Sequence, residues 1–206
     1  SVTGVQACAL PIFHVGRAIY DRFVEAFVEK TRAYRLGDPM DAATSIGPLA
    51  AKGQPAFLAG QVADAVARGG RLVVDPASFD TPKQGWFYAP AVVADAPQDS
   101  ALMAEESFGP VIGILPVSGD EEAIRLMNDS PYGLTASIWT SDPERAARVG
   151  ERVETGTFFM NRCDFLDPAL PWTGVKDTGR GATLSRYGLL QLTQLKSMHL
   201  RVELPK

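Results

Sequence analysis

The sequence predicts an α/β protein built on a largely parallel sheet. Helical and strand-like patterns alternate along the chain of 206 residues, which is the order typical of βαβ units. Val111–Leu115 is a nearly continuous apolar run, as expected for a strand that is covered on both faces. Hydrophobic residues make up 46% of the chain, so it can bury a substantial core.

Helices are predicted where apolar residues recur at helical spacing. In the first of them, Ile19, Phe23 and Phe27 follow one another every fourth position, and charged residues fill the opposite face. Gly37 ends this helix, and Gly69 ends the second. The predicted helices are Arg17–Arg35, Gln54–Arg68, Asp120–Asn128, Pro143–Val153 and Ser185–Gln194.

Strands are predicted in short runs that are rich in β-branched and aromatic residues. Pro90 breaks one run because proline has no backbone N–H to donate to a neighbouring strand. Met198, Leu200 and Val202 alternate with polar residues, which predicts a closing strand with one apolar face. The predicted strands are Phe13–Val15, Arg71–Val74, Phe87–Val93, Val111–Leu115, Ala136–Thr140, Thr157–Asn161 and Ser197–Val202.

The charge pattern and the cysteine count exclude several classes of function. The net charge is −4 and the basic residues are dispersed, so neither nucleic acid nor a membrane is an expected partner. The apolar run Pro110–Val117 is too short to cross a bilayer, and no signal-peptide pattern is visible. Two cysteines cannot form a disulfide framework, which indicates a reducing cytoplasm. His14 and His199 lack metal-ligand spacing, so we expect no metal and interpret them as ordinary strand or surface residues.

Short motifs rich in glycine and proline recur along the chain. Each alone only marks a turn, as such pairs do in many proteins. In chain order they are Gly37-Asp38-Pro39 with Ile46-Gly47-Pro48-Leu49, Gly85-Trp86-Phe87-Tyr88-Ala89-Pro90, Glu105-Glu106-Ser107-Phe108-Gly109-Pro110, Asn128-Asp129-Ser130-Pro131-Tyr132-Gly133-Leu134, Gly156-Thr157 with Asn161, Gly174-Val175-Lys176-Asp177-Thr178-Gly179-Arg180-Gly181 and Tyr187-Gly188-Leu189. Together, in this fixed order over Phe13–Lys206, they resemble the signatures of the aldehyde dehydrogenase superfamily.

The resemblance implies a three-layer α/β catalytic domain of the aldehyde dehydrogenase fold, here incomplete. Residues 13–194 would form this partial catalytic domain, and residues 195–206 an oligomerisation strand and the C-terminus. Members of the family oxidise an aldehyde to a carboxylic acid with NAD or NADP, through a cysteine thioester. The implied partners are a small-molecule aldehyde and, for the parent protein, further copies of itself in a dimer or tetramer.

The resemblance assigns cofactor binding to two residues of one motif. Glu106 aligns with the glutamate that hydrogen-bonds the nicotinamide ribose, and Phe108 with the ring that backs the nicotinamide. A carboxylate can accept hydrogen bonds from both ribose hydroxyls, which gives the assignment a physical basis. The alternative is a solvated turn charge beside an ordinary core phenylalanine. We favour cofactor binding because the Gly-Pro sequence after Phe108 is intact.

The family's substrate tunnel corresponds to the stretch that holds Asn161, Phe165, Leu166 and Trp172. Apolar walls suit the carbon chain of an aldehyde. The apolar members of this set would serve equally well as core. Arg162 and Asp164, in the same stretch, favour a polar or acidic substrate. Cys163 does not match the nucleophile position, so we interpret it as a buried structural thiol.

The first twelve residues do not fit the family pattern. Gln6-Ala7-Cys8 invites assignment as the catalytic G-Q-x-C motif, but Val5 stands in place of its glycine, and a β-branched valine lacks glycine's backbone freedom. Val2–Ile12 instead resembles VTGVQTCALPI, the in-frame translation of a common sequencing adapter, from which only Ala7 differs. We therefore interpret residues 1–12 as a non-native tail and assign no catalytic residue in this chain.

Other parts of the family's active site also have no counterpart in this sequence. The dinucleotide-binding half, the general-base glutamate and the oxyanion asparagine all precede the family's cysteine. We therefore expect the parent protein to be the enzyme and this chain alone to be inactive. A non-catalytic interaction module with the same fold, docking onto full-length subunits, is the alternative. An acyl-CoA-forming or phosphate-reducing relative is disfavoured by the intact Glu106–Pro110 signature. NAD and NADP both fit, because the contact to the ribose 2′ position lies in the absent half.

Overall fold

The computed structural model describes residues 2–7, 10–163 and 165–202. Among these residues, seven strands form one sheet in the order β3-β4-β5-β2-β1-β7-β8. All run in the same direction except β1 and β3, which run against their neighbours. The strands are β1 (Val2–Ala7), β2 (Leu10–Gly16), β3 (Arg71–Val74), β4 (Ala91–Ala94), β5 (Val111–Val117), β7 (Thr135–Trp139) and β8 (Thr157–Met160). The predicted α/β class with a largely parallel sheet is confirmed.

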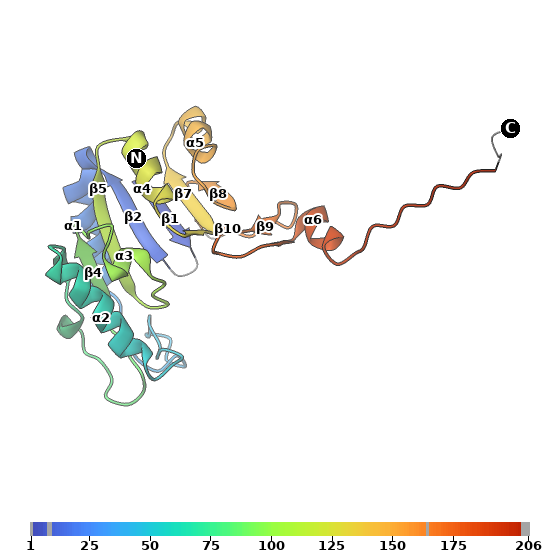
Figure 1. Cartoon of the computed structure of the whole chain (residues 1–206). Coiled ribbons are helices and arrows are strands. Elements are labelled where there is room, and N and C mark those ends of the chain that lie inside the picture. Colours follow the sequence, from blue (N-terminus) through green and yellow to red (C-terminus); the bar gives the residue numbers. More distant parts are fainter. Residues whose placement is uncertain (1, 8–9, 164, 203–206) are drawn as a thin grey trace.

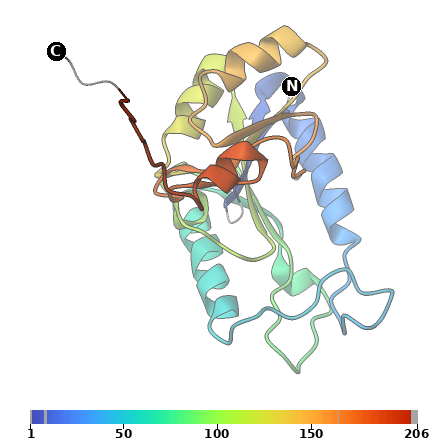
Figure 2. The same cartoon turned by 90° about the vertical axis from the view of Figure 1, so that its right-hand side faces the viewer.

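Helices cover both faces of this sheet and complete three layers (Figures 1 and 2). One face carries a single long helix, and the other carries the remaining helices of the sheet domain. The helices are α1 (Tyr20–Arg32), α2 (Gln54–Ala67), α3 (Ala101–Ala104), α4 (Asp120–Asn128) and α5 (Pro143–Gly150). Two short 3₁₀ turns, Arg17–Ile19 and Pro76–Ser78, lie between these elements.

The α1 face is held by aromatic packing and one buried hydroxyl. Phe13 of β2 packs against Phe23 and Phe27 of α1 with tilted and edge-to-face rings, at centroid distances of 5.5 and 5.3 Å. The Tyr20 hydroxyl donates to the Ile114 carbonyl at 3.3 Å and accepts from the Asp95 amide at 2.8 Å. Burial raises the pKa of Tyr20 to about 12, so this hydroxyl keeps its proton. Its two hydrogen bonds therefore attach α1 to the sheet.

The opposite face is built from two larger clusters and a third, small one that joins α4 to β5. Leu58 of α2 and Met103 of α3 are fully buried against β4 and β5. Beside them, Ile124 of α4 and Val149 of α5 pack onto Ile138 of β7. The spacing of apolar residues predicted these helices, and their buried faces are the apolar ones. The four helices therefore stabilise the strands whose ends carry the candidate site.

The chain after β8 lies outside the main sheet. Its elements are β9 (Trp172–Thr173), β10 (Val175–Lys176), β11 (Ala182–Thr183) and α6 (Ser185–Leu190), and β6 (Tyr132–Gly133) lies before β7. β10 pairs with β6, and β11 pairs with β9. Figure 1 shows this segment leading away from the body of the protein, with the last described residues extended beyond α6.

Several predicted boundaries differ from the structure. The helix predicted over Arg17–Arg35 begins with the 3₁₀ turn and ends at Arg32, and the strand predicted over Phe87–Val93 begins only at Ala91, after Pro90. The prediction of a strand at Ser197–Val202 is wrong for the described chain, where these residues form no strand. Strands need a hydrogen-bonded neighbour, and Val202 is 98% exposed, so none covers it.

Candidate functional site

The loop after α3 presents two predicted site residues to solvent. Glu106 and Phe108 are exposed, and Phe108 keeps 63% of its surface accessible although it is apolar. Ser107 between them is fully buried, and its carbonyl accepts a hydrogen bond from the Gln54 side chain of α2. A buried residue thus anchors the loop while its two neighbours point outward.

The backbone at Phe108 explains how the ring reaches solvent. Its φ is 46°, in the left-handed region that non-glycine residues rarely adopt. The following Gly109 lies against α2 so closely that a Cβ there would be 2.3 Å from Leu58 Cδ1. The glycine therefore permits the close approach to α2, and the strained residue before it turns an aromatic ring outward. Backbone strain of this kind is characteristic of ligand-binding positions.

A second feature is a small cavity at the end of β8. Its volume is about 150 Å³, and its walls are mostly apolar. Phe165 and Trp172 from the predicted substrate set lie in these walls. The complete lining is Thr157, Phe159, Arg162, Phe165, Asp167, Leu170, Pro171, Trp172 and Leu184. A cavity of this kind suits a small ligand with a carbon chain or ring.

The other two residues of the predicted substrate set do not line the cavity. The Asn161 amide donates to the Thr140 carbonyl and accepts from the Thr140 amide, both at 2.9 Å, so it bridges β8 to the end of β7. Leu166 is exposed and lies outside the lining. The sequence interpretation missed Phe159 and Leu184. Phe159 follows Thr157 by two positions, and the alternation along a strand places both on one face.

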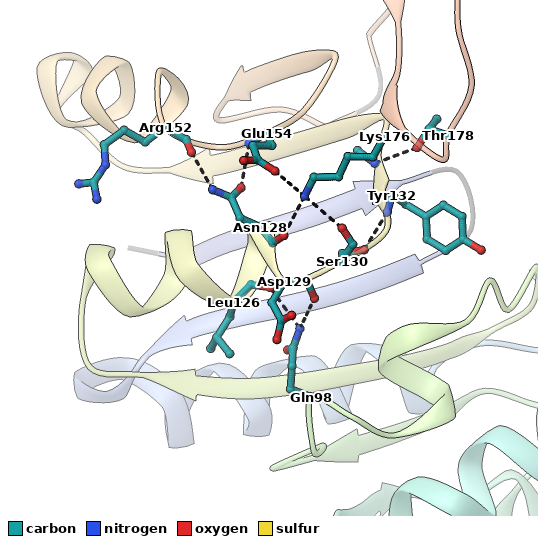
Figure 3. Close-up of polar contacts among 11 residues, drawn as sticks. Gln98, Leu126, Asn128, Asp129, Ser130, Tyr132, Arg152, Glu154, Lys176 and Thr178 are labelled. Carbon is teal, nitrogen blue, oxygen red and sulfur yellow. Dashed lines mark hydrogen bonds and ion pairs between the residues drawn. The ribbon is translucent and has the colours of Figure 1, made fainter.

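A polar cluster fixes the segment that carries this cavity (Figure 3). Lys176 Nζ donates to the carbonyls of Asn128 at 2.7 Å and Ser130 at 3.0 Å, and it forms an ion pair with Glu154 at 2.7 Å. The Asn128 amide in turn donates to the Arg152 carbonyl and accepts from the Glu154 amide, each at 2.8 Å. The end of α4, the chain after α5 and β10 therefore meet at one partly buried ammonium group.

The cysteine and histidine interpretations have mixed outcomes. Cys8 lies outside the described residues, as does Asp164. Cys163 is half-buried rather than buried. His14 is buried within β2, while His199 is exposed. Over the described ranges, no group of three or more His, Cys, Asp or Glu residues is arranged to hold a metal. No helix in the described part is both long and apolar enough to span a membrane.

The sheet between two helix layers, the outward loop at Glu106–Phe108 and the small apolar cavity together define a three-layer α/β domain with two candidate ligand-contact regions. The model of the aldehyde dehydrogenase family matches residues 1–198. The chain belongs to the aldehyde dehydrogenase family. The predicted membership, which depended on the series of glycine and proline motifs, is confirmed.

Individual relatives agree with this assignment. The NADP⁺-dependent succinate-semialdehyde dehydrogenase of Mycobacterium avium is 39% identical over 194 residues, covering 94% of this chain and 41% of the relative. A Comamonas testosteroni protein provisionally named 4-(hydroxymethyl)benzenesulfonate dehydrogenase is 37% identical over 195 residues, covering 94% of this chain and 40% of the relative. The chain thus spans about two fifths of the length of these curated relatives.

Solved structures show the same fold. An aldehyde dehydrogenase from Mycobacterium tuberculosis, complexed with NAD⁺, has a TM-score of 0.84 and 34% identity, covering 93% of this chain and 40% of that one. An NAD⁺ complex of an aldehyde dehydrogenase from Bacillus cereus has a TM-score of 0.85 and 30% identity, covering 92% and 38%. The sheet with helices on both faces is therefore the fold of this family, in the incomplete form that the sequence predicts.

Proposed function

We propose that this chain is the C-terminal, catalytic-domain part of an NAD(P)-dependent aldehyde dehydrogenase that oxidises an aldehyde to a carboxylic acid through a cysteine thioester. The observation that carries the proposal is the loop in which Glu106 and Phe108 are turned outward around the buried Ser107. The exposed Phe108 ring, on a strained backbone, packs against no core among the described residues of this domain. A planar ligand that stacks against the ring would give it a binding role.

The loop residues fit a nicotinamide cofactor. The Glu106 carboxylate is exposed, and no cation within the described ranges pairs with it, so it can accept hydrogen bonds from ribose hydroxyls. The Phe108 ring would support one face of the nicotinamide. When bound, the cofactor would supply the acceptor for the hydride that leaves the aldehyde carbon. NAD or NADP would serve, and both occur in the names of related proteins.

The substrate in this proposal is an aldehyde bound near the cavity at β8. Phe165 and Trp172 would contact its carbon skeleton from the cavity walls. Asn161 and Leu166 belong to the same proposed region, and Asn161 supports it through its two hydrogen bonds to Thr140. The named substrates of the relatives from Mycobacterium avium and Comamonas testosteroni both carry an anionic group.

We propose that residues 1–12 are a non-native tail and that the nucleophile belongs to upstream sequence of the parent. The arrangement of β1 supports this. It lies between β2 and β7, which run parallel to each other, yet β1 is antiparallel to both. A segment foreign to the family's sheet could pair in this antiparallel way with the facing edges of β2 and β7. The chain alone would then lack catalytic activity.

Residues 195–206 are proposed to form an oligomerisation strand in a cytoplasmic dimer or tetramer of the parent. Met198, Leu200 and Val202 alternate along the tail and are all strongly exposed, as expected for a strand whose neighbour belongs to another chain. The same exposed apolar tail favours the second candidate function, a non-catalytic module that docks onto full-length subunits.

Replacement of Glu106 by glutamine tests the proposed function in the whole parent protein. We expect kcat/KM for the nicotinamide cofactor to fall by about tenfold or more, because a charged acceptor is replaced by a neutral one. Formation of NADH or NADPH from a panel of aldehydes measures this. Glu105→Gln is the matched control, since Glu105 is an exposed neighbour outside the proposed contact. Absence of any aldehyde oxidation in the wild-type parent would contradict the proposed function.

A further inference from the structure

One charged side chain stands out in the wall of the apolar cavity at β8. Arg162 lines it together with aromatic residues, and its guanidinium lies 3.7 Å from the centroid of the Phe165 ring. A guanidinium stacked on an aromatic face keeps its in-plane N–H donors directed outward from its edge. The stacking therefore orients Arg162 without using its hydrogen-bond donors.

Within the described part of the chain, no carboxylate lies within ion-pair distance of Arg162. Its side chain contacts the Phe165 ring, and its backbone carbonyl accepts a hydrogen bond from the Ser137 hydroxyl. The backbone is thus held to β7 while the charge has no carboxylate partner among the described residues. Arginines with carboxylate partners occur elsewhere in the fold, as at Arg145 with Asp120.

The neighbouring acid in the cavity does not neutralise this charge. Asp167 also lines the cavity, but its Oδ1 accepts a hydrogen bond from the Ala169 amide at 2.9 Å, within its own turn. This contact stabilises the turn that shapes one wall. The negative charge of Asp167 would still repel an anion in the cavity. Replacing Asp167 therefore tests whether an anion binds there.

We propose that Arg162 is a specificity-determining residue that holds an anionic group of the ligand, a carboxylate or a sulfonate, while the aromatic walls contact the ligand's carbon skeleton. The proposal deepens the proposed function, on which it rests, by naming the class of aldehyde: one that carries a negatively charged group in addition to its aldehyde group. Guanidinium groups suit both anions because their paired donors match two acceptor oxygens.

The test measures the binding of benzoate and benzamide to the full 206-residue chain. The two probes have nearly the same shape and differ in charge. Saturation-transfer NMR at low ionic strength gives their affinities for the wild type and for Arg162→Met. We expect the wild type to bind benzoate about tenfold more tightly than benzamide, and Arg162→Met to lose this preference. Arg162→Lys is expected to keep part of it.

Two further variants separate this role from a general effect of charge. Arg186 also lies over an aromatic ring, at 5.0 Å from the Tyr187 centroid, but outside the cavity. Arg186→Met is therefore the matched control and should keep the preference for benzoate. Asp167→Asn should strengthen benzoate binding, because it removes a like charge.

An unchanged preference in Arg162→Met, an equal loss in Arg186→Met, or no preference in the wild type would each overturn the assignment of Arg162. These outcomes are distinct from failure of the proposed function. That failure would appear as absence of aldehyde oxidation by the whole parent protein, whereas the benzoate measurement requires no catalysis.

Discussion

Replacement of Gly156 by alanine is expected to lower the free energy of unfolding by about 3 kcal/mol, near the upper end of overpacking effects. A Cβ at this position would lie 1.7 Å from the Thr173 carbonyl oxygen and 2.4 Å from its carbon. Both are backbone atoms, so the clash cannot be relieved by turning a side chain. The Gly156 amide also donates to the Gly133 carbonyl at 3.1 Å, and a shift would disturb that junction.

Urea denaturation measures this change, and Gly60→Ala is its control. Gly60 lies within α2, and a Cβ at this position would meet no atom within 4 Å, so alanine there should raise stability by about 0.5–1 kcal/mol through helix propensity. Limited proteolysis provides a second readout, since the loosened junction should expose the segment that carries the cavity. Equal effects of the two alanine substitutions would contradict the proposed packing at Gly156.

Acidification from pH 7 to pH 5 is expected to lower the free energy of unfolding by about 2 kcal/mol through His14 alone. Burial lowers the pKa of His14 from 6.5 to about 4, against the smaller opposing effects of Gln98 and Glu122. Between these two pKa values, His14 is protonated in the unfolded chain but neutral in the folded chain. The contribution of His14 to the free energy of unfolding is therefore fully present above pH 6.5 and decreases as the pH falls from 6.5 toward 4.

His14→Leu should remove most of this dependence, because leucine carries no proton in either state. Urea unfolding at pH 7 and pH 5 measures the difference for both proteins. The paired carboxylates do not obscure it. Arg145 and Arg152 hold the pKa values of Asp120 and Glu121 below their usual 3.8 and 4.5, so the stability these carboxylates contribute is lost mainly below the pH 7 to pH 5 range. A leucine variant with the same pH dependence as the wild type would contradict the assignment to His14.

Much of the fold was predictable because its elements are local. The apolar spacing of α1 and the continuous run of β5 are properties of neighbouring residues. α1 lies within the predicted range, and β5 includes the whole predicted run. The prediction of the closing strand is wrong because a strand depends on a neighbouring strand, and the described residues place none beside Met198 or Val202. β1 is absent from the predicted strands because the sequence pattern marks residues 1–12 as non-native.

Part of the loop geometry follows from the motif itself. Phe108 is exposed, unlike the core phenylalanine of the alternative interpretation, and Gly109 after it allows the approach to α2; the cofactor role of Phe108 stays a prediction. Other motif residues have structural roles that spacing alone does not reveal. Gly156 makes room for the Thr173 carbonyl, and Asn161 bridges to Thr140. These contacts join segments far apart in sequence, so only the folded arrangement identifies them.

The measurement that most directly tests the central proposal is a long, adapter-free DNA read running upstream through the codon for Phe13 in the source genome. We expect an uninterrupted frame that carries the G-Q-x-C motif and a dinucleotide-binding domain immediately before Phe13. Cys8 would then have no place in the mechanism, and the parent would be a full-length aldehyde dehydrogenase. A read that confirms Ser1–Ile12 as genomic would contradict this. It would make Cys8 the leading nucleophile candidate and favour the interaction module over the enzyme.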